Sequence, residues 1–115
     1  MPLPRIDHAY IPEEKLTGYL LSETHAVGKA KAKFFLAHGY DAASSEQLAR
    51  DLLEIARSNP VEQEVVSPHG TKYLVSGILK TPGGTTVAVR TVWIVEPGDE
   101  RPRFVTAYPR WKWKS

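Results

Sequence analysis

Three separate segments of the sequence carry side chains suited to acid–base chemistry on a phosphodiester. His25 stands before an expected helix, and Lys31 falls on the stripe of that helix that should be apolar. Arg90 interrupts a nearly apolar strand, and Thr106 and Tyr108 put two hydroxyls on one face of a later strand. Histidine can accept or donate a proton near neutral pH, while fixed cations stabilise charge on phosphate oxygens. Such a set is the minimum for cleaving RNA without a metal ion.

Each of these residues also has a structural interpretation. Arg90 could form an ion pair with an aspartate or glutamate, and Lys31 could extend its ammonium to water beside the core. Tyr108 fits a half-buried core tyrosine, and Thr106 is an ordinary strand residue. His25 alone fits a plain loop histidine. Catalytic and structural roles therefore compete at all five positions.

The rest of the sequence argues against sites built on cysteine, on a metal ion or on a phosphate-binding glycine loop. The chain has no cysteine, which excludes disulfides, zinc–thiolate sites, iron–sulfur clusters and cysteine nucleophiles. The four histidines lack metal-ligand spacing and the carboxylates form no evident pair, so we expect no metal and no cofactor. The turn at residues 82–84 lacks the lysine and the helix that a phosphate-binding glycine loop needs.

Length, hydropathy and charge favour one soluble domain over residues 1–115. No apolar run is long enough to span a bilayer and no signal-peptide pattern is present, so we expect a cytoplasmic protein without a membrane partner. The formal charge is only +2, but basic residues gather early and late around an acidic middle. A near-neutral total can therefore hide one basic face, although evenly solvated charge fits the distribution as well. As an RNA-binding face its members would be Lys29, Lys33, Arg103 and Arg110.

Hydrophobic periodicity predicts helices first and strands afterwards. An extended lead-in over residues 1–11 precedes helices expected at 12–21, 27–38 and 44–58, the last with a capping box of Ser44 and Gln47. After Pro60 the period changes to two, and strands are expected near 62–67, 71–79, 85–96 and 103–108. We therefore expect an α+β fold, with two or three N-terminal helices packed on a four-stranded antiparallel sheet. Residues 109–115 would be a frayed tail, a last strand or a base-stacking arm.

The same residues carry a resemblance to a known family. The shared pattern begins with Pro4, Asp7 and Glu14-Lys-Leu16, and continues with His25-x-x-Gly28-x-x-Lys31-Ala32-x-x-Phe35, Gly70-x-x-Tyr73, Arg90-Thr-Val-Trp93-Ile-Val95 and Thr106-Ala-Tyr108. It covers nearly the whole chain and resembles small bacterial domains of unknown function, found alone beside a small partner gene or at the C-terminus of polymorphic toxins. The domain also looks like the barnase–EndoU–colicin–RelE class of metal-independent ribonucleases.

The resemblance implies catalytic roles for His25, Lys31, Arg90, Thr106 and Tyr108. It implies a toxin that cleaves RNA by attack of the ribose 2′-hydroxyl, and a neutralising immunity or antitoxin protein as partner. Such a domain acts in the cytoplasm, and is delivered into a target cell when it belongs to a secreted toxin. Two alternatives stay open: a non-catalytic module that binds RNA or protein, and a structural domain in which the cations pair with acids. An imidazole more than ~10 Å from both cations would refute the nuclease hypothesis.

Overall fold

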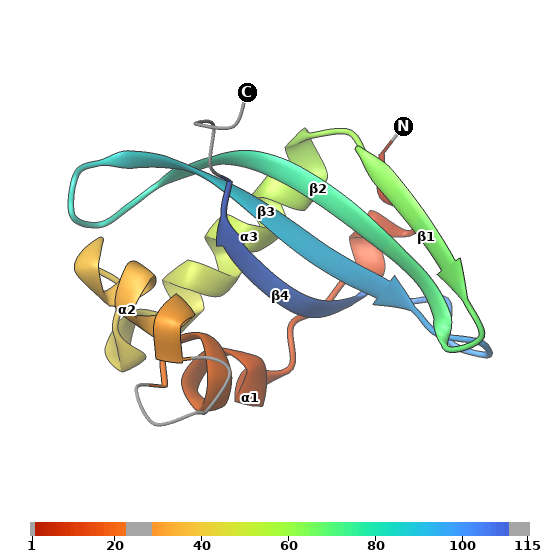
Figure 1. Ribbon diagram of the computed structural model, residues 1–115, viewed down its shortest axis with the longest axis horizontal. Helices are drawn as coiled ribbons and strands as arrows, with labels where there is room; N and C mark the ends of the chain where they lie inside the picture. The colour runs from red at the N-terminus through yellow and green to blue at the C-terminus, as the bar shows by residue number, and fades with distance from the viewer. Residues whose placement is uncertain (1, 23–28, 111–115) are drawn as a thin grey trace.

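Helices and sheet form two layers (Figure 1). The computed structural model describes residues 2–22 and 29–110 of the chain. In this part of the chain, three helices lie on one side of a curved four-stranded sheet. The expected α+β class, with N-terminal helices and a four-stranded antiparallel sheet, is confirmed.

The sheet is a meander in which each strand pairs with the next one along the chain. Its strands are β1 (Gln63–Ser67), β2 (Gly70–Lys80), β3 (Thr86–Val95) and β4 (Arg103–Pro109), all antiparallel and in that spatial order. All four expected strands are present, with small differences at their ends. A bulge in the pairing of β3 with β4 follows Val92, so that Val105 is an extra residue in β4.

Alternation along β3 gives the sheet one covered face and one outer face. Val89, Thr91 and Trp93 are fully buried on the helix side, while Arg90 points to the outer face, as the period of two predicts. The Trp93 indole N–H donates to the Thr91 hydroxyl at 2.8 Å, and that hydroxyl donates to the Val75 carbonyl at 2.8 Å. The polar groups of this buried region are therefore satisfied within the sheet.

The longest helix, α3 (Ser45–Ser58), packs its apolar stripe on the sheet through Leu48, Leu52 and Ile55. A short 3₁₀ turn, Ala42–Ser44, precedes it. The expected capping box of Ser44 with Gln47 is wrong: the Asp41 carboxylate accepts the Ser44 backbone N–H at 3.1 Å, and the Ser44 hydroxyl accepts the Asp41 N–H at 2.8 Å. The reciprocal cap therefore belongs to the 3₁₀ turn.

Two shorter helices flank β4. The helix expected at 12–21 is a single turn, α1 (Glu13–Lys15), followed by a π-helical turn, Leu16–Leu20, whose end residues are buried. The helix expected at 27–38 is α2 (Lys29–Ala37); its first two expected residues lie outside the described chain. Ala32 and Phe35 bury the inner side of α2 completely.

The segment expected as an extended lead-in is packed onto the molecule. Leu3 is 1% exposed within the core, and a 3₁₀ turn at Ile6–His8 interrupts the extended backbone. Tyr10 then forms a parallel bridge with Arg103, and its carbonyl accepts the Phe104 N–H at 3.0 Å. The N-terminal segment thus covers the start of the β4 edge. At the other end of the chain, Pro109 belongs to β4, and residues 111–115 lie outside the described part.

The tip of the β2–β3 hairpin rests on the end of α2. Gly39 ends that helix with φ of 100°, and the His38 carbonyl accepts the Gly83 N–H at 3.0 Å. The His38 imidazole Nδ1 lies 2.9 Å from the Thr85 hydroxyl. A Cβ on Gly39 would stand 2.7 Å from the Gly83 nitrogen, so two glycines permit this approach.

Candidate functional site

Lys31 is connected to β4 by Tyr19, which contacts the lysine with its ring and Thr106 of β4 with its hydroxyl. Tyr19 was not among the candidate residues chosen from the sequence. The Lys31 ammonium lies 5.8 Å from the centroid of the Tyr19 ring, and the Lys15 ammonium lies 5.0 Å from the same centroid. The Tyr19 hydroxyl shares a hydrogen bond of 3.0 Å with the Thr106 hydroxyl. We call Lys15, Tyr19, Lys31 and Thr106 the edge cluster. Within it, the lysine on the apolar stripe of α2 meets an aromatic face, a contact favourable to a cation.

A second group of polar side chains lies on the outer face of the sheet. Arg90 donates through Nη2 to Glu62 Oε2 at 3.1 Å, and Arg110 Nη2 lies 3.6 Å from the same oxygen. The other oxygen of Glu62 accepts a hydrogen bond from the Ser76 hydroxyl. Arg90 stands directly opposite Tyr108 in the β3–β4 register. We call Glu62, Ser76, Arg90, Tyr108 and Arg110 the face cluster.

β4 joins the two clusters into one strip. Thr106 is the partner of Val92 and Tyr108 is the partner of Arg90, so both hydroxyl-bearing residues lie on the outer face, two positions apart. Four of the five residues selected for catalysis, Lys31, Arg90, Thr106 and Tyr108, thus lie along this strip. The fifth, His25, lies outside the described residues, and its role and its distance from the cations stay predictions.

Burial and charge act in opposite directions on Glu62. Burial alone would raise the pKa of its carboxyl group, but the Ser76 hydrogen bond with the Arg90 and Arg110 charges outweighs burial and lowers that pKa below its ordinary value of 4.5. The neighbouring Tyr108 hydroxyl and Glu62 raise the pKa of Arg90. Arg90 Nε is buried and has no hydrogen-bond partner among the described residues. Glu62 therefore carries its charge at neutral pH and engages only part of the Arg90 guanidinium.

Of the four residues expected to bind RNA, the structure describes the side chains of three. Lys33 is exposed on α2, whereas Arg103 Nε donates to Glu96 Oε1 at 3.1 Å. Arg110 belongs to the face cluster, and the Lys29 side chain lies outside the described part. Two of the four cations are thus already paired with acids.

Four residues of the strip were not selected from the sequence: Lys15, Tyr19, Glu62 and Ser76. Tyr19 follows Lys15 by four positions in the helical segment, a spacing that brings a cation over a ring, and this signal was available. Glu62 had no local signal, because its role depends on the register of β1, β2 and β3. In the sequence it belonged only to an acidic middle section.

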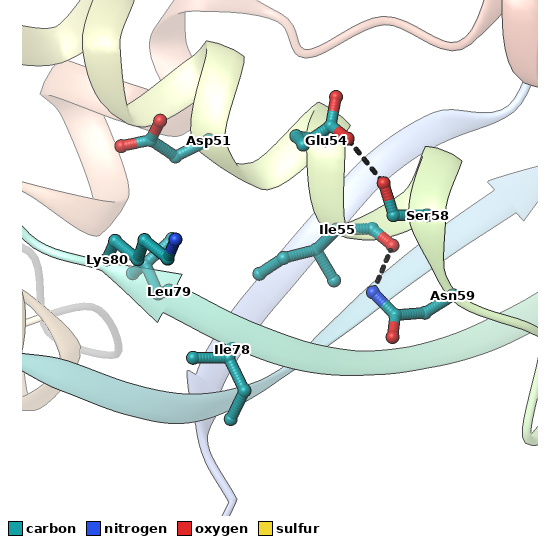
Figure 2. Close-up of a pocket in the computed structure, with 8 residues that line it drawn as sticks. All are labelled: Asp51, Glu54, Ile55, Ser58, Asn59, Ile78, Leu79 and Lys80. Atoms are coloured by element: carbon teal, nitrogen blue, oxygen red, sulfur yellow. Dashed lines mark hydrogen bonds between the residues drawn. The ribbon is translucent and has the colours of Figure 1, made fainter.

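A hollow of about 260 Å³ lies elsewhere, between α3 and the end of β2 (Figure 2). Its lining includes two carboxylates and one ammonium, those of Asp51, Glu54 and Lys80. Glu54 accepts a hydrogen bond from Ser58, and Asn59 donates to the Ile55 carbonyl at 2.9 Å. No residue of the strip lines this hollow, so the pocket and the candidate site are separate.

The described residues contain neither a cluster of metal ligands nor a membrane-spanning helix. Within residues 2–22 and 29–110, no three histidine, aspartate or glutamate side chains gather as metal ligands would. No helix in the same ranges combines the length and the apolar character required to cross a bilayer.

Comparison with known proteins gives one family and one fold. The family model for a domain of unknown function (DUF6883) matches residues 2–111. Among solved structures, a chain of a contact-dependent growth inhibition toxin–immunity protein complex from Klebsiella pneumoniae 342 superposes with a TM-score of 0.70 at 16% identity, covering 93% of this chain and 97% of that one. No curated protein matches the chain. At this identity the solved structure establishes a shared fold.

Proposed function

We propose that this chain, which belongs to the DUF6883 family, is the toxin of a toxin–immunity pair and cleaves RNA without a metal ion. The observation that carries the proposal is the strip itself: Lys31, Thr106, Tyr108 and Arg90 come from α2, β4 and β3 and lie along one strand. The fold shared with a chain of a toxin–immunity complex supports a place for this chain in such a pair.

The proposed reaction uses the strip to hold one phosphodiester. The 2′-oxygen of a ribose attacks the adjacent phosphorus, the bond from phosphorus to the 5′-oxygen breaks, and the products are a 2′,3′-cyclic phosphate and a 5′-hydroxyl. His25 takes the proton of the 2′-hydroxyl or gives one to the leaving 5′-oxygen. Lys31 and Arg90 stabilise the extra negative charge on the phosphate, while Thr106 and Tyr108 position it or stack a base.

Purified protein incubated with total RNA and EDTA tests this proposal. Wild type should produce cyclic phosphate ends, and His25→Ala or Lys31→Ala should lose at least about a hundredfold in rate. Lys33→Ala is the matched control for Lys31, because it removes the same charge two positions along α2 from an exposed side chain. Equal rates for Lys31→Ala and Lys33→Ala, or cleavage of an all-deoxy substrate, would refute the mechanism.

A second candidate function is a binding module that holds RNA or a partner protein without turnover. The specific observation in its favour is that three of the selected arginines already lie in ion pairs: Glu62 pairs with Arg90 and Arg110, and Glu96 pairs with Arg103. His25→Ala separates the two functions. Under the nuclease proposal it abolishes cleavage and leaves RNA binding intact, whereas a pure module shows no cleavage even in wild type.

The partners follow from the same proposal. The substrate is RNA in the cytoplasm, and the neutralising protein presents acidic side chains that cover the strip and compete with RNA phosphates. Its inhibition should therefore weaken as salt concentration rises.

A further inference from the structure

The face cluster places two guanidinium groups and a hydroxyl around one anionic point. Glu62 Oε2 lies 3.1 Å from Arg90 Nη2 and 3.6 Å from Arg110 Nη2, and Ser76 donates to the other oxygen. These donors come from β2, β3 and the residue after β4. The chain itself supplies the anion, which is the carboxylate of Glu62.

The hydrogen bonding between the Arg90 guanidinium and the Glu62 carboxylate is incomplete. Arg90 Nε is buried without a hydrogen-bond partner among the described residues, so Glu62 engages one of the two nitrogens on that edge of the guanidinium. Arginine binds phosphate best through two parallel hydrogen bonds, which a phosphodiester with two non-bridging oxygens can accept. A phosphate in place of the carboxylate would satisfy the nitrogen that Glu62 leaves unpaired.

Glu62 is also free to leave without a change in the fold. It stands just before β1, its backbone N–H donates to the Leu74 carbonyl at 2.8 Å, and its side chain is 28% exposed. Rotation about its own side-chain bonds is therefore enough to carry the carboxylate into water. The exchange conserves charge, because a phosphodiester and a carboxylate each carry one negative charge.

We propose that Arg90 and Arg110 form a phosphate subsite at one end of the strip, on the outer face of the sheet, where Ser76 holds Glu62 as an internal anion which a phosphodiester displaces. Tyr108 lies opposite Arg90 and two residues from Thr106, roughly 7 Å along β4, so one single strand can contact this subsite and the edge cluster together. The inference rests on the proposed function only in taking RNA as the source of the phosphate. It adds that Glu62 sets the affinity for RNA by competition.

Binding of a 2′-O-methyl RNA oligonucleotide tests the subsite, because this probe has no free 2′-hydroxyl to attack. Fluorescence anisotropy over a range of salt concentrations would compare wild type with Glu62→Gln. The variant should bind about tenfold more tightly, since Arg90 and Arg110 lose their competitor. Its plot of log affinity against log salt should be no less steep than that of wild type, because the same phosphate contact forms in both proteins.

Glu64→Gln is the matched control. Glu64 is exposed on β1 opposite Tyr73, and its replacement removes the same charge without touching the two arginines. Equal affinities for Glu62→Gln and Glu64→Gln would overturn the inference, because net charge alone would then explain the change. Arg110→Gln added to Glu62→Gln should remove most of the gain, and its persistence would equally count against the subsite.

Ser76→Ala keeps the test valid if Glu62→Gln fails to fold. It removes only the hydrogen bond to Glu62, and should shift affinity in the same direction by a smaller factor; unchanged affinity would overturn the inference.

Cleavage of ordinary RNA, measured in parallel, separates this inference from the proposed function. Tighter binding by Glu62→Gln without cleavage by any protein would support the subsite and refute the nuclease. Cleavage by wild type, with equal RNA affinities for Glu62→Gln and Glu64→Gln, would support the nuclease and refute the subsite.

Discussion

Thr106 links the two layers of the molecule through one hydroxyl. It lies on the outer face of β4, yet it shares a hydrogen bond of 3.0 Å with Tyr19, which belongs to the helical segment. The same tyrosine carries the contacts of Lys15 and Lys31. Loss of this hydrogen bond would therefore loosen the strip as well as the fold.

A double-mutant cycle measures this link. Thr106→Val and Tyr19→Phe each remove one hydroxyl, and we expect each to lower the free energy of unfolding by about 1 kcal/mol. The double variant should lose less than the sum, with a coupling of about 0.5–1.5 kcal/mol in urea denaturation. Thr86→Val, on the exposed start of β3, provides a control that should stay within about 0.5 kcal/mol of wild type. Strict additivity at Tyr19 and Thr106 would show that the bond contributes nothing.

Glu62 gives the stability of the protein a defined dependence on pH. Because its pKa is lower in the folded chain than its ordinary value of 4.5, its contribution to stability is present above pH 4.5 and is lost as pH falls through the lower folded value. Glu62→Gln should therefore be less stable than wild type at pH 7. Between about pH 5 and pH 3 its free energy of unfolding should fall by less than that of wild type. Thermal melts across this range provide the measurement. Glu64→Gln should keep the wild-type slope, and the same slope in Glu62→Gln would contradict the assignment.

Elements differ in how far their sequence predicts them. The amphipathic spacing of Leu48, Leu52 and Ile55 was enough to identify α3, and alternation after Pro60 was enough for the four strands. These patterns repeat several times along their element. Local sequence was therefore sufficient for the fold class.

Single features without repetition were not predictable in this way. Both Asp41 and Ser44 are good capping residues, and the preceding 3₁₀ turn decides that Asp41 caps it while Ser44 has no side-chain cap on α3. Leu16 and Leu20 fit an α-helix and a π-turn equally well. Lys31 stood out as a cation on an apolar stripe, but its ring partner Tyr19 depends on how two helices pack. The carboxylate of Glu62 depends on the register of three strands.

The contact of α2 with the β2–β3 hairpin makes a prediction at the scale of elements. Gly39→Ala should lower the free energy of unfolding by about 2 kcal/mol or more, because φ of 100° strains any side chain and the new Cβ would stand 2.7 Å from Gly83. Gly98→Ala is the matched control: it has φ of 84° but nothing within 4 Å, so it should cost only about 1 kcal/mol. Equal losses in denaturant unfolding would mean that the hairpin moves away from α2 without cost.

At the scale of the whole molecule, the two types of cation have different roles. Every ion pair among the described residues uses an arginine, from Arg5 with Glu100 to Arg110 with Glu62. Lys15 and Lys31 instead lie over the Tyr19 ring, and Lys33 is exposed. Within the described residues, these three lysines form no ion pair.

The N-terminal segment is part of the core of the whole molecule, and its removal should be costly. Leu3→Ala should lower the free energy of unfolding by about 3 kcal/mol, because the side chain is 1% exposed and leaves a cavity. Val66→Ala, at a position that is 75% exposed, should change stability by less than about 0.5 kcal/mol. Chemical denaturation of both variants gives the comparison, and similar small effects would show that the segment docks only loosely.

The meander order of the strands also affects the order in which contacts can form during folding. Each strand pairs with the next one along the chain, so the sheet can form one hairpin at a time. Each of these steps closes only a short loop, and contacts between residues close in sequence form fast. The bridge of Tyr10 to Arg103 joins opposite ends of the chain and must wait for β4. The contacts of the N-terminal segment with the sheet edge are therefore complete only once β4 is in place.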